Sequence, residues 1–149
     1  MAHTYCSSLF HCVFSTGERQ RAIASEFQER LWAYMGGIAR ENEMKALAAG
    51  GMDDHAHLLL SLPSSVAIAE AMRKIKSGSS RWLHESCGLT RFEWQEGYGA
   101  FTIGLSQVDA TVAYIAGQTE HHQKRDFQAE FLAIFKQHRI EYDSRYVWG

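Results

Sequence analysis

The chain contains little of what marks secreted, disulfide-bonded or membrane proteins. It has one proline and three cysteines in 149 residues, and a net charge of only −2. The cysteines, Cys6, Cys12 and Cys87, are odd in number and lack CxxC spacing, which predicts reduced thiols and disfavours a zinc knuckle. No apolar run is long enough to span a bilayer and no charged-then-apolar leader is present, so we expect a cytoplasmic protein without a membrane partner. The near-neutral charge neither indicates nor excludes a nucleic-acid partner.

What is present indicates one globular domain over residues 1–149. Hydrophobic residues make up 46% of the chain, and the sequence shows no repeat, low-complexity tract or internal linker. Periodicity predicts strands at about 4–14, 44–49 and 53–62, with strand pieces at about 92–95 and 100–103. It predicts helices at about 25–42, from 64 or 65 to at least 78, at about 107–124, and from 127 onward.

Local signals suggest where these elements begin and end. Ser25 is a candidate N-cap, with Gln28 completing a capping box, and Ser64 or Ser65 is a candidate cap for the next helix. Gly50-Gly51 is expected to turn the chain between two strands. The resulting order, β-α-β-β-α-β and then two helices, predicts an α+β protein with a ferredoxin-like (split βαβ) antiparallel sheet whose helices cover one face.

Two histidines one residue apart, His55 and His57, stand within the run Asp-Asp-His-Ala-His-Leu-Leu-Leu. On a strand they would project side by side, while Ala56, Leu58 and Leu60 point into a core. Two parallel imidazoles can ligate one divalent metal, and packing alone would leave their ring nitrogens to be satisfied. From these residues alone, a pair of exposed histidines on an edge strand remains an equal alternative.

The helix expected at about 107–124 carries a second signal. Tyr114 and Gln118 are four residues apart and would share a helix face. A glutamine carbonyl is a competent though weak ligand for Mg²⁺ or Mn²⁺, and a tyrosine phenol can act as a covalent nucleophile. His121 or His122 could replace or supplement Gln118, or could belong to a solvated helix end.

A basic stretch follows the histidine strand. Its candidate DNA-binding residues combine cations, a hydroxyl and an aromatic ring, a mixture that suits a phosphate backbone and a stacked base. A solvated helix face explains the same residues. The candidates are Arg73, Lys74, Lys76, Ser77, Arg81 and Trp82.

Five segments, in register along nearly the whole chain, together resemble the single-tyrosine HUH transposases of the IS200-like type. These are the short enzymes of the smallest bacterial insertion sequences, and REP-associated tyrosine transposases are related to them. The segments are 53–60 with the histidine pair, 114–118 with Tyr-Ile-Ala-Gly-Gln, 74–83, 94–101 and 141–148.

The resemblance implies a homodimer with a ferredoxin-like core that binds single-stranded DNA hairpins at the ends of a mobile element. It implies that His55, His57 and Gln118 hold Mg²⁺ or Mn²⁺, and His122 remains a possible additional ligand from its spacing to Gln118. Tyr114 would attack a DNA phosphorus, forming a 5′-phosphotyrosine and freeing a 3′-hydroxyl that later reseals DNA. In family dimers the tyrosine helix of one subunit can lie over the histidines of the other.

Two other hypotheses fit parts of the sequence. A ferredoxin-like nucleic-acid-binding module without catalysis explains the fold and the basic stretch but leaves the metal geometry unused. A metal-dependent hydrolase that uses bound water, with His121 or His122 as third ligand, leaves Tyr114 without a role. The slightly acidic charge also departs from the basic character expected of a DNA-handling protein.

Overall fold

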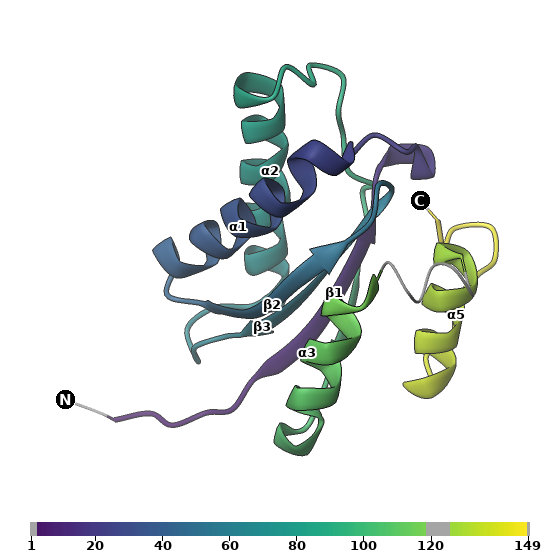
Figure 1. Cartoon of the computed structure of the whole chain (residues 1–149). Helices are drawn as coiled ribbons and strands as arrows, with labels where there is room; N and C mark the ends of the chain where they lie inside the picture. The colour runs from purple at the N-terminus through teal and green to yellow at the C-terminus, as the bar shows by residue number, and fades with distance from the viewer. Residues whose placement is uncertain (1–2, 119–125, 149) are drawn as a thin grey trace.

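A four-stranded antiparallel sheet with helices on both faces forms the frame of the molecule (Figure 1). The computed structural model describes residues 3–118 and 126–148. Its strands run in the order β2-β3-β1-β4, which is the ferredoxin-like arrangement that the sequence predicts. In chain order the elements are β1 Leu9–Ser15, α1 Ser25–Glu41, β2 Lys45–Gly51, β3 His55–Ser61, α2 Ile68–Ser86, β4 Gly99–Thr102, α3 Val108–Ala116 and α5 Phe127–Gln137, with short 3-10 turns at Gly17–Arg19 and Leu105–Gln107.

Helices α1 and α2 cover one face of the sheet, where the main apolar core lies (Figure 1). Strand β3 is paired on both sides, with β1 and with β2. Leu58 lies opposite Cys12 of β1, and both side chains are fully buried against helix residues such as Met35 and Met72. The alternation in β3 therefore points one set of side chains into this core, as period-2 geometry requires.

Helices α3 and α5 lie on the opposite face. Helix α5 packs Phe127, Phe131 and Ile134 against Val13 of β1 and Phe101 of β4. Helix α3 contacts β2 and β3. None of the helices among the described residues is long and apolar enough to cross a membrane.

Gly50 and Gly78 lie where neighbouring elements pack closely, and neither lies in a turn. A Cβ on Gly50 would lie 2.7 Å from the carbonyl oxygen of Ile115, so the glycine allows α3 to rest directly on β2. Gly50 and Gly51 lie inside β2, and the turn falls at 52–54, which corrects the predicted turn. A Cβ on Gly78 would lie 2.9 Å from Cδ1 of Ile38, so Gly78 brings α1 and α2 together while α2 continues to Ser86.

The predicted helix caps at Ser25 and at Ser64 or Ser65 are wrong. Ala24 and Ala67 are the N-cap residues of α1 and α2, and neither offers a side-chain cap. The Gln28 amide donates to the carbonyl of Ile23 instead of closing a capping box. Cap signals failed here because tertiary packing of the apolar faces, and not local hydrogen bonding, fixes where these helices begin.

Candidate active site

The histidine pair lies on the central strand β3 and is fully buried. His55 and His57 are each 0% exposed, and their ring centroids are 5.1 Å apart. They pair in register with Ser15 and Val13 of β1, on the sheet face covered by α3 and α5. The alternative of exposed histidines on an edge strand is therefore wrong.

Each imidazole is held by protein groups from distant segments. His55 Nδ1 lies 2.7 Å from Oδ1 of Asp54, and its Nε2 lies 3.0 Å from Oε1 of Gln118. His57 Nε2 lies 2.6 Å from Oε1 of Glu130 on α5, and the same oxygen is 3.7 Å from His55 Nε2. Four ligand-type atoms, two nitrogens and two oxygens, therefore face one another.

This donor set fits a divalent cation. Asp54 holds the His55 ring at Nδ1, and the ring's Nε2 faces the oxygens of Gln118 and Glu130. In the tautomer protonated at Nδ1, Nε2 offers a lone pair that a cation can accept. The ligand atoms of His55, His57 and Glu130 all lie within 4.8 Å of one another. Imidazole nitrogens with carboxylate and amide oxygens suit a first-row divalent metal or Mg²⁺.

Of the ligands that the resemblance implies, the structure brings together His55, His57 and Gln118. Gln118 follows the end of α3, and its amide Nε2 donates to the main-chain carbonyl of Tyr114 at 3.2 Å, which fixes the direction of Oε1. Helix α3 ends at Ala116 with Gly117 as its C-cap, and the predicted continuation over residues 119–124 lies outside the described residues. His121 and His122 lie outside the described residues.

Sequence reasoning missed Glu130. It is buried, 1% exposed, on the stripe of α5 that also carries Phe127, Phe131 and Ile134. A carboxylate on the apolar stripe of a helix is costly unless it is paired, so its position was the available signal. Asp126 caps this helix by accepting a hydrogen bond from the backbone N–H of Ala129 at 2.9 Å, which supports the segment that carries Glu130.

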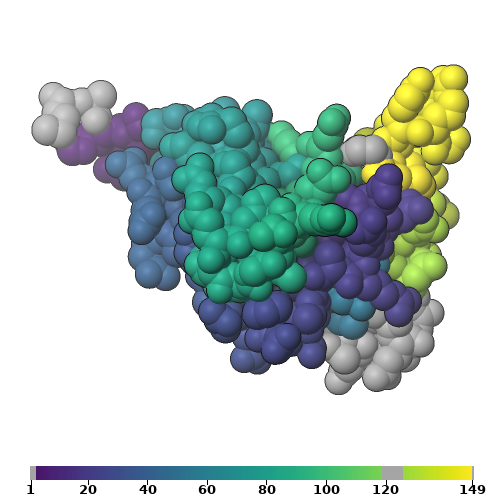
Figure 2. Space-filling model, turned by 90° about the horizontal axis from the view of Figure 1, so that it is seen from above, coloured from purple at the N-terminus to yellow at the C-terminus, as the bar shows by residue number. Residues whose placement is uncertain are grey.

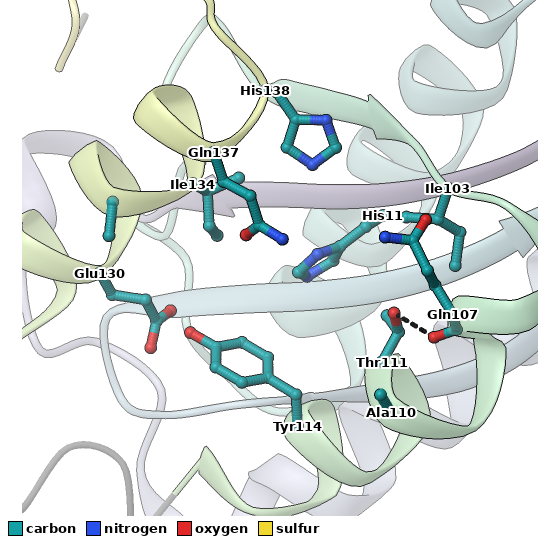
Figure 3. Close-up of a pocket in the computed structure, with 11 residues that line it drawn as sticks. His11, Ile103, Gln107, Ala110, Thr111, Tyr114, Glu130, Ile134, Gln137 and His138 are labelled. Atoms are coloured by element: carbon teal, nitrogen blue, oxygen red, sulfur yellow. Dashed lines mark hydrogen bonds between the residues drawn. The ribbon is translucent and has the colours of Figure 1, made fainter.

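Tyr114 is half-buried beside the histidines. Its ring stands edge-on to His57, with centroids 5.7 Å apart, and to His11, with centroids 6.0 Å apart. Its hydroxyl points toward the carboxylate of Glu130 (Figure 3). Tyr114 also lines a cavity of about 280 Å³ between α3 and α5, together with Gln107, Thr111, Gln137 and His138 among others. A substrate can therefore reach the phenol from the cavity side.

His11 of β1 is a second residue that sequence reasoning missed. It is 7% exposed, and its Nε2 lies 2.9 Å from Nδ1 of His57. Burial, followed by the proximity of His57, lowers the pKa of His11 from 6.5 to about 3, so the ring is neutral at physiological pH. Its position two residues from Val13 on one strand face becomes informative only when the pairing of β1 with β3 is known.

The predicted DNA-binding residues lie on α2, against the other face of the sheet from the histidines. The Lys76 ammonium donates to the main-chain carbonyls of 95, 96 and 97 at 2.6, 3.0 and 2.9 Å, so it ties a loop to the helix. Burial lowers the pKa of Lys76 to about 8, with Glu96 opposing the shift. Arg73 and Lys74 both pair with Glu70, at 2.6 and 3.8 Å.

The remaining candidates on α2 are Ser77, Arg81 and Trp82. Ser77 and Arg81 are exposed. Trp82 stacks on Tyr34 of α1 with ring centroids 5.0 Å apart, and the Arg30 guanidinium lies 5.4 Å from the Trp82 ring. The surfaces of α1 and α2 are neighbours in the space-filling view, with α5 at the other end of the molecule (Figure 2). A DNA-binding role for this surface stays a prediction.

Sequence comparison assigns residues 4–118 to the family described as "Transposase IS200 like". The transposase for insertion sequence element IS200 of Salmonella typhimurium is 26% identical over 140 residues, covering 90% of this chain and 89% of the relative. The IS200 transposase of Salmonella typhi matches to the same extent.

Two solved structures share the fold. A Deinococcus radiodurans R1 protein described as a transposase gives a TM-score of 0.60 at 21% identity, covering 79% of this chain and 96% of that one. A REP-associated tyrosine transposase, solved bound to a REP hairpin, gives 0.59 at 18% identity, covering 82% and 73%. The family match spans most of the chain and includes the histidine pair, Tyr114 and Gln118. The chain therefore belongs to the IS200-like transposase family.

Proposed function

We propose that this transposase cuts and rejoins single-stranded DNA, with Tyr114 as the nucleophile and His55 and His57 as ligands of a Mg²⁺ or Mn²⁺ ion. The observation that carries the proposal is the position of Tyr114. Its ring lies between the histidine pair and an open cavity, 5.7 Å from the His57 ring. A DNA phosphate that enters from the cavity would meet the phenol and the cation site together.

His55, His57, Gln118 and Glu130 would hold the metal ion, because their ligand atoms converge. When bound, the ion supplies positive charge that polarises the phosphate and stabilises charge developing on its oxygens. The Asp54 carboxylate holds the His55 ring at Nδ1 and so keeps Nε2 directed at the site.

The phenol supplies the covalent step. The Tyr114 oxygen forms a bond to phosphorus while the bond from phosphorus to the 3′-oxygen breaks, leaving a 5′-phosphotyrosine and a 3′-hydroxyl. The phenol proton passes to water in the cavity as the phenol oxygen attacks, and the departing 3′-oxygen takes a proton from water. Attack by a 3′-hydroxyl on the phosphotyrosine reverses these bonds and reseals DNA, so no nucleotide cofactor is consumed.

The proposal extends to the DNA partner and the assembly. The structural relative solved with a REP hairpin supports a hairpin as the substrate of this chain. The surface of α2 that carries the exposed residues Arg73, Ser77 and Arg81 and the half-buried Trp82 is the one we assign to that hairpin. A homodimer is proposed from the family resemblance. In it the Tyr114 helix could act on its own histidines, as in the single chain described here, or on those of the partner subunit.

The test is a covalent-adduct assay. The protein is incubated with a labelled pool of single-stranded hairpins with randomised flanks, in Mg²⁺ or Mn²⁺, and then denatured. We expect an adduct that is absent in Tyr114→Phe and lost by at least about 10³-fold in His57→Ala, because the nucleophile and a ligand are removed. Hairpin binding should remain in both variants. Tyr5→Phe, at an exposed position, is the matched control and should behave as wild type.

Other outcomes distinguish the alternatives. Binding without an adduct in either metal, across the whole pool, would indicate a non-catalytic module. Cleavage that survives Tyr114→Phe would indicate a hydrolase that uses bound water. Full activity of His57→Ala would refute the metal assignment.

A further inference from the structure

His11 lies directly behind the metal-facing histidine, and the proposed function assigns it no role. Its Nε2 is 2.9 Å from Nδ1 of His57, and the two rings stack with centroids 5.1 Å apart at 29°. His57 therefore has Nε2 facing Glu130 and His55, and Nδ1 facing His11. This places His11 outside the ligand set but in contact with one of its members.

The chemistry of imidazole makes that contact specific. A neutral imidazole binds a metal through the nitrogen that lacks a proton, so the other nitrogen carries the proton and needs an acceptor. For His57 the binding nitrogen is Nε2, and the acceptor available to Nδ1–H is His11 Nε2.

The same ring also touches the nucleophile. His11 and Tyr114 meet edge to face with centroids 6.0 Å apart, and Tyr114 stands edge-on to His57 as well. His11, His57 and Tyr114 thus form a triangle of rings. A shift of the His11 ring would be transmitted to a metal ligand and to the phenol together.

We propose that His11 is a positioning residue, which accepts the Nδ1 proton of His57 so that Nε2 binds the metal, and supports the ring of Tyr114. This rests on the proposed function only in taking His57 as a ligand. Asp54 does the corresponding work for His55, so the two imidazoles are oriented by different partners, a carboxylate and a neutral imidazole.

Metal binding without DNA tests the proposal. Mn²⁺ affinity is measured by calorimetry and by electron paramagnetic resonance for wild type, His11→Phe and His11→Gln. We expect His11→Phe to bind Mn²⁺ about 10- to 100-fold more weakly, the range found when such outer partners are removed. His11→Gln should recover most of that loss, because its amide oxygen can accept the Nδ1 proton. His138→Phe is the matched control, since His138 lines the same cavity and packs on Phe101, and it should leave the affinity unchanged.

A second measurement works on the wild-type protein and does not depend on the folding of a variant. With ¹⁵N-labelled histidines and diamagnetic Zn²⁺ or Mg²⁺, the bound state should show His57 protonated at Nδ1 and His11 unprotonated at Nε2. The opposite protonation pattern would refute the proposal, as would wild-type affinity in His11→Phe. Equal loss in His11→Phe and His11→Gln would also refute it, because the role would then be packing.

The outcomes also separate this inference from the proposed function. Normal Mn²⁺ binding with no DNA adduct would refute the proposed reaction and leave the role of His11 standing. An adduct-forming protein in which His11→Phe binds Mn²⁺ normally would refute only the role of His11. A wild-type protein that binds no divalent metal would refute both.

Discussion

The two faces of the sheet are built from the same strands but from different chemistry. Under α1 and α2 the buried side chains are almost all apolar and form one large cluster. Under α3 and α5 the apolar cluster is small, with Val13, Phe101, Phe127, Phe131 and Ile134 as its buried members. Beside it lie the buried polar groups His11, Ser15, His55, His57 and Glu130.

Along strand β3, apolar and polar side chains point to opposite faces of the sheet. Ala56, Leu58 and Leu60 belong to the large cluster, whereas His55 and His57 point the other way into the site. Burying polar groups costs free energy unless each is hydrogen-bonded, and among the described residues every buried side-chain nitrogen and oxygen has a partner. The face under α1 and α2 therefore provides most of the apolar burial that stabilises the fold, whereas the face under α3 and α5 holds a cluster of buried polar groups.

The largest expected effect comes from a substitution in the apolar core under α1 and α2. Leu58→Ala removes a fully buried side chain from the large cluster and should lower the free energy of unfolding by about 2–5 kcal/mol. Urea unfolding measures the loss. Mn²⁺ affinity of the folded fraction should stay at the wild-type value. Leu47→Ala, at a position 42% exposed, is the control and should change stability by no more than about 0.5 kcal/mol. Equal losses of unfolding free energy in Leu58→Ala and Leu47→Ala would contradict the view that the core under α1 and α2 stabilises the fold.

An intermediate loss of stability is expected from a substitution at the contact between α3 and β2. Gly50→Ala places a Cβ 2.7 Å from the carbonyl oxygen of Ile115, so α3 must move away from β2. We expect a loss of roughly 1–3 kcal/mol and a larger proportional loss of adduct formation, because Tyr114 and Gln118 move with α3. Gly37→Ala in α1 meets nothing within 4 Å and should instead stabilise the protein by about 0.5–1 kcal/mol. Unchanged adduct formation in Gly50→Ala would count against this placement of α3.

The smallest expected effect is a dependence of stability on pH that comes from His11. His11 has its pKa lowered from 6.5 to about 3 by burial, so between these values the unfolded chain binds a proton that the folded chain does not. Stability is then lost as the pH falls from about 6.5 toward 3. Over the unit from pH 6.5 to 5.5 the loss attributable to His11 should reach up to about 1 kcal/mol. Urea unfolding at several pH values, with chelator present, compares wild type with His11→Gln, whose slope should be shallower. Identical slopes would mean that His11 is not buried in its neutral form.

The sequence predicted the sheet well because its signals are local. The apolar run around His57 and the helical spacing of Leu31 and Met35 are both signals within single elements. Motifs spread along the chain also indicated the family, which the family comparison confirmed. The helix caps were predicted less well: α1 begins at Ser25 as predicted, but its N-cap residue is Ala24 and not Ser25.

The site was predictable only in part, because half of it depends on pairings between distant segments. His55 and His57 are two positions apart on one strand, and Gln118 is four residues from Tyr114, so both pairs could be found from the sequence. His11 reaches His57 across 46 residues through the register of β1 with β3, and Glu130 reaches it across 73 residues through the docking of α5. Neither contact leaves a periodic signal in the sequence. The catalytic, metal-binding and DNA-binding roles of the predicted residues remain predictions.

His11 and Glu130 are far apart in sequence, and this separation determines when, during synthesis, the candidate site can form. Strand β1 contributes His11 to one side of the site, and α5, which is made much later, contributes Glu130 to the other side. During synthesis, the amino-terminal strands are made first, yet His57 has no carboxylate opposite it until α5 has been made and has docked. A ribosome-bound chain that stops before α5 therefore carries the histidines and the tyrosine without the complete site. Any reaction that needs Glu130 beside the histidines would therefore have to wait until α5 has docked on the sheet.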